Sequence, residues 1–210
     1  WLTPRWAAGK PIYGVNHVIC HVAVTQLQFG ALPANTMALI VSGGHTSLLH
    51  VDDIARHIDV VGTTLDDATG ECFDKVARLL GFPYPGGPHI DEHARRGDPH
   101  AIRVPQGLTQ GNAGKRHPYD FSFSGVKTAV ARWIEQRQAA GEAVPVDDVA
   151  ALLEQGERHG VDVRLPERAL CTDNGAMVAM LGVNLVEAGV HPSPLDFPID
   201  SAMPLTRISM

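Results

Sequence analysis

The order of apolar and polar residues along this chain predicts short strands alternating with amphipathic helices. Residues 37–41 form an apolar run that is too short for most helices and contains β-branched Ile40 and Val41, so it predicts a buried strand. Ser42-Gly43-Gly44 predicts a tight turn, and residues 47–51 predict a second strand. The unit is therefore a hairpin. It has neither GxxxxGK[ST] nor GxGxxG, the glycine motifs that precede a helix in common phosphate sites.

The same pattern continues along the rest of the chain. Further strands are predicted at 12–15, 58–61 and 161–165, and around Phe121 and Phe123. Helices are predicted from Asn16 to about 27, at 66–80, around Asp91, at 125–140, at 148–158 after Asp147, and from a Thr172 or Asp173 cap through 188. PYPGGP at 83–88 predicts a rigid irregular loop, and the proline-rich tail after Gly189 is expected to lie over the surface or be disordered.

Composition limits the classes of function. The 210 residues suffice for one large domain or two small ones, and 44% of them are apolar. A net charge of −6 excludes a global basic field, so any nucleic-acid contact must be a local patch, and the dense basic cluster is Lys115-Arg116-His117. Three widely spaced cysteines without a CxxC indicate reduced thiols and a cytoplasmic protein, and no membrane-length apolar run appears. The chain opens on Trp1, so we expect N-terminal material to be missing.

Two histidines share one face of the predicted helix after Asn16. His17 and His21 are four residues apart, a spacing that lets both rings hold one metal ion. A structural or solvated pair has the same spacing, so the pattern alone leaves both readings open. A zinc protease needs HExxH, with glutamate as the base, and Val18 occupies that position here.

Other candidate residues also have ordinary explanations. The glycine turn alone fits a simple hairpin, and the acids Glu71 and Asp74 alone fit a solvated helix face. Asp173 lies where a helix begins, so capping alone would account for it.

Six motifs nevertheless occur in a fixed order. They are Asn16-His17-xxx-His21, Val41-Ser42-Gly43-Gly44-His45-Thr46, Asp66-Asp67 with Gly70-Glu71 and Phe73-Asp74-Lys75, Tyr84-Pro85-Gly86-Gly87-Pro88, Phe123-Ser124-Gly125-x-Lys127-Thr128, and Cys171-Thr172-Asp173-Asn174. Together they closely resemble the TsaD family of tRNA threonylcarbamoyl-adenosine synthases. The likeness runs from residue 13 to residue 189, and chance does not supply six such motifs in order.

The resemblance implies an α/β, actin-like (ASKHA) fold of two ribonuclease H-like halves, incomplete in this chain. Residues 1–36 would be the remnant of the first half with the metal-binding helix. Residues 37–165 would be the second half, internally deleted, and 166–210 a C-terminal segment. The implied activity is transfer of a threonylcarbamoyl group from threonylcarbamoyl-AMP to N6 of the adenosine next to the anticodon in ANN-decoding tRNAs. The implied partners are tRNA, TsaB and TsaE.

The resemblance also implies site residues. The metal ligands map onto His17, His21 and Asp173, and two histidines with one carboxylate suit Fe(II) or Zn. The substrate loop maps onto Ile40, Val41, Ser42, Gly43 and Gly44, and further substrate contacts map onto Asp74, Gly87 and Asp91. No covalent nucleophile is required, and no general base can be named.

The chain departs from the family pattern in one internal stretch. The family has a second glycine loop, GGVxxN, before the LCTDN motif, whereas here Val149-Ala150-Ala151 runs almost directly into Leu152-Leu153-Glu154. Two other hypotheses therefore stand beside the transferase: a catalytically impaired remnant that binds metal, adenylate or a partner protein, and a metalloprotease, which Val18 disfavours.

Overall fold

The computed structural model describes residues 9–103, 118–154 and 164–210. Their contacts divide the chain into two compact units. The first comprises residues 1–40, 48–61 and 162–210, and the second comprises residues 41–47 and 62–161. The predicted boundaries at 36 and 165 refer to the halves of the family's fold, and they stay a prediction.

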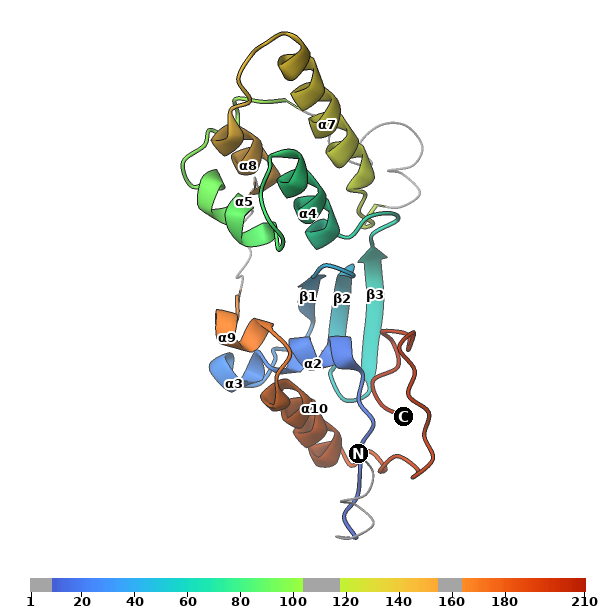
Figure 1. Ribbon diagram of the computed structural model, residues 1–210. Coiled ribbons are helices and arrows are strands. Elements are labelled where there is room, and N and C mark those ends of the chain that lie inside the picture. Colours follow the sequence, from blue (N-terminus) through green and yellow to red (C-terminus); the bar gives the residue numbers. More distant parts are fainter. Residues whose placement is uncertain (1–8, 104–117, 155–163) are drawn as a thin grey trace. The chain divides into compact units, whose positions relative to one another are not determined.

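Two helices, three consecutive strands and then further helices follow one another along the described chain, as Figure 1 shows, so strands and helices do not alternate as the sequence pattern predicted. They are α2 (His17–Ala23), α3 (Gln26–Phe29), β1 (Thr36–Val41), β2 (Thr46–Asp53), β3 (His57–Thr63), α4 (Thr69–Leu79), α5 (Gly87–Ala94), α7 (Ser124–Ala139), α8 (Val146–Glu154), α9 (Arg168–Cys171) and α10 (Gly175–Glu187). The three central strands confirm the predicted runs at 37–41, 47–51 and 58–61. None of the helices in the described ranges is long and apolar enough to cross a membrane.

The first unit is built on a three-stranded sheet in the order β1-β2-β3. Leu49 and Val51 alternate along β2 and enter the same core as Ile58 of β3. That core also takes the apolar faces of α2 and α10, which pack against each other. Helix α2 therefore has a fixed position over one face of the sheet, and its histidines lie outside the core.

The C-terminal tail holds the start of α2. Asn16 Oδ1 accepts hydrogen bonds from the first-turn amides, as predicted for a cap. Its Nδ2 donates to the carbonyls of Pro204 and Arg207, and its backbone N–H donates to Ile208 O at 2.8 Å. Ile208 is buried. Of the two expected alternatives, the tail lies over the surface rather than being disordered, because an apolar side chain and several hydrogen bonds fix its end.

Two predictions about the N-terminal segment also need correction. The predicted helix from Asn16 to 27 is two helices, because the Thr25 hydroxyl donates to Val22 O at 2.8 Å and occupies the carbonyl that helix continuation would use. The predicted strand at 12–15 is reduced to a single bridge between Val15 and Ser209.

The second unit consists mainly of α4, α5, α7 and α8. Cys72 and Val76 of α4 share a buried cluster with Val130 and Ile134 of α7 and Val149 of α8. A second cluster joins α4 and α8 to Ile90 of α5. Apolar residues recur at three- and four-residue spacing on each helix, so each turns one stripe inward.

Several boundaries in the second unit differ from prediction for identifiable reasons. Helix α4 begins at Thr69 rather than Asp66, because Asp66 binds the amide of Phe123 and Asp67 binds Lys127 of α7 as well as Lys75 of α4. The loop predicted at 83–88 ends early: Gly87 and Pro88 already belong to α5, where a missing N–H costs nothing. Asp147 lies inside α8 instead of capping it.

Two predicted strands are absent from the described residues. Around Phe121 there is only one bridge, to Thr64, because Asp66 takes the amides of Phe123 and Ser124 and starts α7 there. Residues 164 and 165 have no regular structure, and the rest of the strand predicted at 161–165, like the basic cluster at 115–117, lies outside the described residues.

One face of β1 carries exposed apolar side chains. Met37, Leu39 and Val41 are 51%, 57% and 53% exposed, whereas Ala38 and Ile40 pack against the core of the first unit. Strand β1 is also at the edge of the sheet. The sheet therefore has an uncovered apolar edge in this chain.

Candidate metal and substrate sites

His17, His21 and Asp173 come together although the last is far away in sequence. Helix α2 presents both rings on one side, and the centroids of the two rings are 5.1 Å apart. Asp173 reaches them from the segment between α9 and α10, within the same unit. The predicted Thr172 or Asp173 cap is wrong: Asn174 caps α10 by accepting the Met177 N–H at 2.9 Å. The Asp173 carboxylate is thereby available to the histidines.

The three side chains have ligand-like distances. Asp173 Oδ1 lies 3.3 Å from His17 Nε2 and 3.2 Å from His21 Nε2, and one ligand atom of each residue lies within 4.8 Å of the others. Ligands about 2.1 Å from one metal ion are about 3.0–3.4 Å apart in octahedral or tetrahedral geometry. The residues present therefore fit a divalent metal, with Asp173 and His17 open to solvent for additional ligands.

The predicted substrate loop forms the turn between β1 and β2. The Ser42 N–H donates to His45 O at 2.8 Å, and the Ser42 hydroxyl accepts from the amides of Gly44 and His45. A phosphate oxygen bound to those two amides would take the place of that hydroxyl. Residues 41–44 are exposed, whereas Ile40 is partly buried in the sheet.

Helix α4 connects the loop with two other predicted substrate residues. The Gly70 N–H, in its first turn, donates to Ser42 O at 3.2 Å. One turn later, Asp74 accepts the Gly86 N–H at 2.7 Å, next to Gly87 at the start of α5. Asp91 lies one turn further along α5 and pairs with Arg95 at 2.8 Å. Val41 to Gly44, Asp74, Gly87 and Asp91 belong to the second unit, whereas Ile40 and the three candidate metal ligands belong to the first. Their roles in substrate binding stay predictions.

Gly43→Val is expected to weaken adenylate binding strongly without unfolding the protein. A Cβ added at Gly43 meets no atom within 4 Å, so the hairpin can accept it, but the branched side chain would occupy the space above the loop amides. Steric overlap of about 1–3 kcal/mol lowers affinity roughly tenfold or more. Calorimetric titration with AMP measures the effect. Gly182→Val, which also adds its Cβ to open space but on α10, is the control. Equal AMP affinity in both variants would refute the placement.

An acidic pair ahead of α4 organises the second unit, and the sequence did not reveal its role. Asp67 accepts from Lys75 Nζ at 3.0 Å and from Lys127 Nζ at 2.6 Å, and thus joins α4 to α7. Hydrogen bonds from Lys127 and Lys75 lower the pKa of Asp67. The resemblance motifs contain all three residues, but only the folded chain shows that they meet.

Asp66 supports the start of α7 in the same way. Burial would raise the pKa of Asp66, but the hydroxyls of Ser122 and Ser124 and the amides of Phe123 and Ser124 outweigh it and lower the pKa to about 2. The carboxylate is therefore the form that stabilises the fold.

Asp66→Asn is expected to lower the melting temperature at pH 7 by about 2–4 °C, as loss of a helix cap does. Since the folded pKa lies below the unfolded value of about 3.9, Asp66 stabilises above pH 4, and this contribution disappears as the pH falls through 2. Thermal unfolding between pH 2 and pH 7 measures it. Asp200→Asn, an exposed aspartate of the tail, is the control. If the melting temperatures of the two variants depended on pH in the same way, Asp66 would contribute no more to stability than an ordinary exposed aspartate.

Comparison with known proteins decides the family. The family model described as "TsaD: tRNA N6-adenosine threonylcarbamoyltransferase" matches residues 3–180. The chain belongs to the TsaD family. A protein of Bifidobacterium adolescentis named tRNA N6-adenosine threonylcarbamoyltransferase is 67% identical over 246 residues, which cover 98% of this chain and 71% of the relative. A protein of the same name from Bifidobacterium longum is 66% identical over the same shares. Membership in the TsaD family brings the actin-like ASKHA fold, of which this α/β chain is a part.

The lengths of these matches also bear on the internal deletion. Each extends over 246 residues, whereas this chain has 210. At least 36 positions within the matched region therefore have no counterpart in this chain. A segment of that length could form one strand and an adjoining helix. This agrees with an internal loss such as the absent GGVxxN loop.

Proposed function

We propose that this chain is a tRNA-modifying acyltransferase that moves the threonylcarbamoyl group of threonylcarbamoyl-AMP to N6 of the adenosine next to the anticodon in ANN-decoding tRNAs. Family membership and the names of its relatives support the reaction. The observation in the fold that carries the proposal is the convergence of His17, His21 and Asp173 from two separate segments.

The three residues would hold Fe(II) or Zn(II). Two imidazoles and one carboxylate with open positions are a donor set that both metals accept. When bound, the ion would supply a Lewis acid that polarises or orients a carbonyl oxygen. Asn174 contributes indirectly, because its capping role leaves the neighbouring carboxylate of Asp173 free.

The hairpin would hold the adenylate phosphate. Its amides lie in a glycine turn with open space beside Gly43 and Gly44, where a phosphate oxygen would replace the Ser42 hydroxyl, and α4 fixes the turn through the hydrogen bond from Gly70 to Ser42. A Cβ at Gly70 would lie 2.7 Å from Ser42 O, so this position needs glycine to keep the hairpin in place. Asp74 of α4 and Gly87 at the start of α5 would contact the substrate beside the hairpin. Asp91 would contact it from the next turn of α5.

The reaction needs no covalent enzyme intermediate. The N6 amine of adenosine forms a bond to the carbamoyl carbon, and the bond from that carbon to the phosphate oxygen breaks. AMP leaves with the electron pair, and the amine loses one proton to solvent or to a base that we do not assign. Positioning and charge stabilisation then carry most of the rate.

Transfer of a radiolabelled threonylcarbamoyl group from threonylcarbamoyl-AMP to ANN-decoding tRNA tests this proposal. TsaB and TsaE are added because the family resemblance implies them as partners. Incorporation above the protein-free rate supports it. No incorporation, together with intact metal or adenylate binding, would favour the impaired remnant, and cleavage of casein or a glycoprotein would favour the metalloprotease. We further propose a cytoplasmic location, which the free thiols Cys20, Cys72 and Cys171 support.

A further inference from the structure

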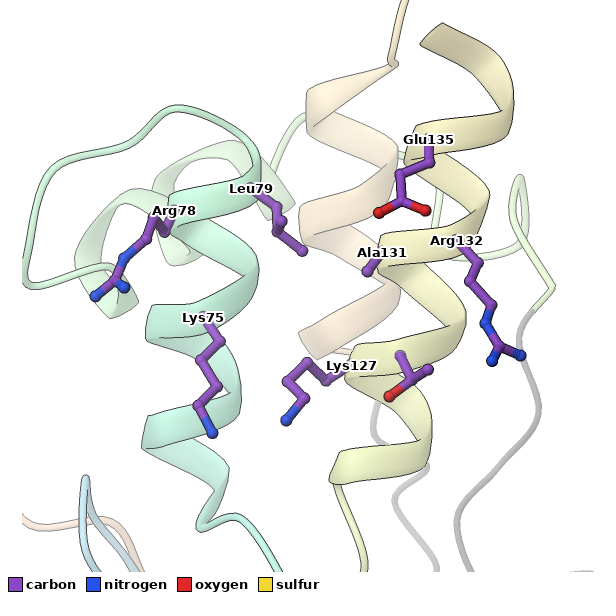
Figure 2. A pocket seen from close by; sticks show the side chains of 8 residues that line it. Lys75, Arg78, Leu79, Lys127, Ala131, Arg132 and Glu135 are labelled. Carbon is purple, nitrogen blue, oxygen red and sulfur yellow. The ribbon is translucent and has the colours of Figure 1, made fainter. Parts of the chain in front are cut away.

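A groove of about 490 Å³ lies between α4 and α7 in the second unit. Cations line it from both helices, as Figure 2 shows: Lys75 and Arg78 belong to α4, and Lys127 and Arg132 to α7. Leu79 contributes apolar surface, and Glu135 is the acid among the lining residues. Such a concentration of positive charge is unexpected in a chain with a net charge of −6.

The lysines and the arginines of the groove differ in how they are neutralised. Lys75 pairs with Asp67 at 3.0 Å and Glu71 at 2.7 Å, and Lys127 pairs with Asp67 at 2.6 Å. The hydrogen bonds that Lys75 donates to Glu71 and Asp67 raise the pKa of Lys75, so it stays charged. The lysines thus join the walls of the groove, and their charge is largely compensated.

Arg78 and Arg132 are exposed, and neither has a carboxylate partner among the residues that the structure describes. Figure 2 shows their side chains extending away from each other, one from each helix. Because the two guanidinium groups point in different directions, they cannot both bind one small anion. They suit a polymer that carries a negative charge at each repeat, and arginine forms two-pronged hydrogen bonds with phosphate.

We propose that the phosphate backbone of tRNA lies across the groove between α4 and α7 and is bound by Arg78 and Arg132, one on each side of it. The inference rests on the proposed function for the identity of the RNA. Its role would be to hold the body of the substrate, at a surface separate from the predicted adenylate loop. Phosphate contacts of this kind fix position and carry no sequence information.

Binding of fluorescently labelled tRNA to the 210-residue protein, measured by anisotropy between 50 and 200 mM salt, tests the proposal. Arg78→Gln and Arg132→Gln should each weaken binding roughly threefold, and the double variant about tenfold. The slope of log K against log salt should fall by about 1 for each arginine. Arg207→Gln, which removes an exposed arginine from the tail, should leave both quantities unchanged.

The outcomes are separable from those of the proposed function. Unchanged affinity and slope in the double variant would overturn the groove, whether or not the chain transfers threonylcarbamoyl groups. Loss of binding in the double variant with equal loss in Arg207→Gln would also overturn it, as a general charge effect. Displacement of tRNA by polyglutamate of equal charge at equal concentration would show a site for acidic protein instead. Coincident melting curves of all variants would establish that folding is not the cause.

Discussion

Restoring the internal segment that its relatives carry should raise single-turnover transfer to tRNA by roughly 10²-fold or more over the chain as it stands. The absent GGVxxN loop would supply backbone donors and an asparagine to the substrate. Loss of a hydrogen bond to a buried polar ligand costs about 1–3 kcal/mol, so two such losses account for a rate decrease of this size.

The fold gives a second reason for the same expectation. The matched relatives have at least 36 positions that this chain lacks, and β1 lies at the sheet edge with its outer apolar side chains exposed. If the restored segment supplied a strand to that edge and a helix over its outer face, it would bury Met37, Leu39 and Val41. The restored protein should therefore also be more stable and less prone to association.

The measurement compares both chains in quenched-flow transfer of threonylcarbamoyl from its adenylate to tRNA, at saturating protein. A third protein, with a glycine-serine linker of equal length in place of the segment, controls for added length. Equal rates in the original and restored chains would mean that the deletion does not impair the site.

His17→Ala is expected to lose nearly all bound metal while the protein stays folded. The wild-type chain should hold about one Fe or Zn ion, and removal of one of three protein ligands should weaken binding by roughly 10²-fold or more. His17 is 58% exposed and contributes little to the core, so its truncation leaves α2 intact. Elemental analysis of freshly purified protein gives the stoichiometry, and circular dichroism gives the fold.

His57 provides a matched control. It is 59% exposed and lies 3.8 Å from Asp52 and from Asp59, yet this group does not bring three ligand atoms as close together as His17, His21 and Asp173. His57→Ala should keep the full metal content. Metal absent from the folded wild-type protein, or retained equally in both variants, would contradict the assignment.

Local sequence patterns predicted the parts of the fold that depend on short-range spacing. The apolar run at 37–41 predicted strand β1, because a run this short that contains β-branched Ile40 and Val41 favours a strand over a helix, and both features are set within a few residues. The spacing of His17 and His21 fixed their common face in the same way. Asp173 joined them in the prediction through the family resemblance, since no spacing rule connects residues so far apart in sequence.

The errors have a common physical origin in side chains that bond to the backbone or to distant residues. The Thr25 hydroxyl ends α2 early, and Asn174 rather than Asp173 caps α10. The sequence pattern placed Asp66 and Asp67 at the start of a helix. In the structure they precede α4, because Asp66 accepts the amide of Phe123 and Asp67 accepts from Lys127 of α7. In each case a side chain can form more than one hydrogen bond, and only the complete fold decides which one it forms.

The hydrogen bonds between Asn16 and the tail have a practical consequence for handling the protein. Pro204 and Arg207 hold the amide nitrogen of Asn16, and Ile208 holds its backbone N–H, so the first turn of the helix that carries both histidines depends on the last residues of this chain. Removal of residues 204–210 would loosen that turn. An affinity tag is therefore better placed elsewhere, or after a flexible spacer, before metal content is assayed.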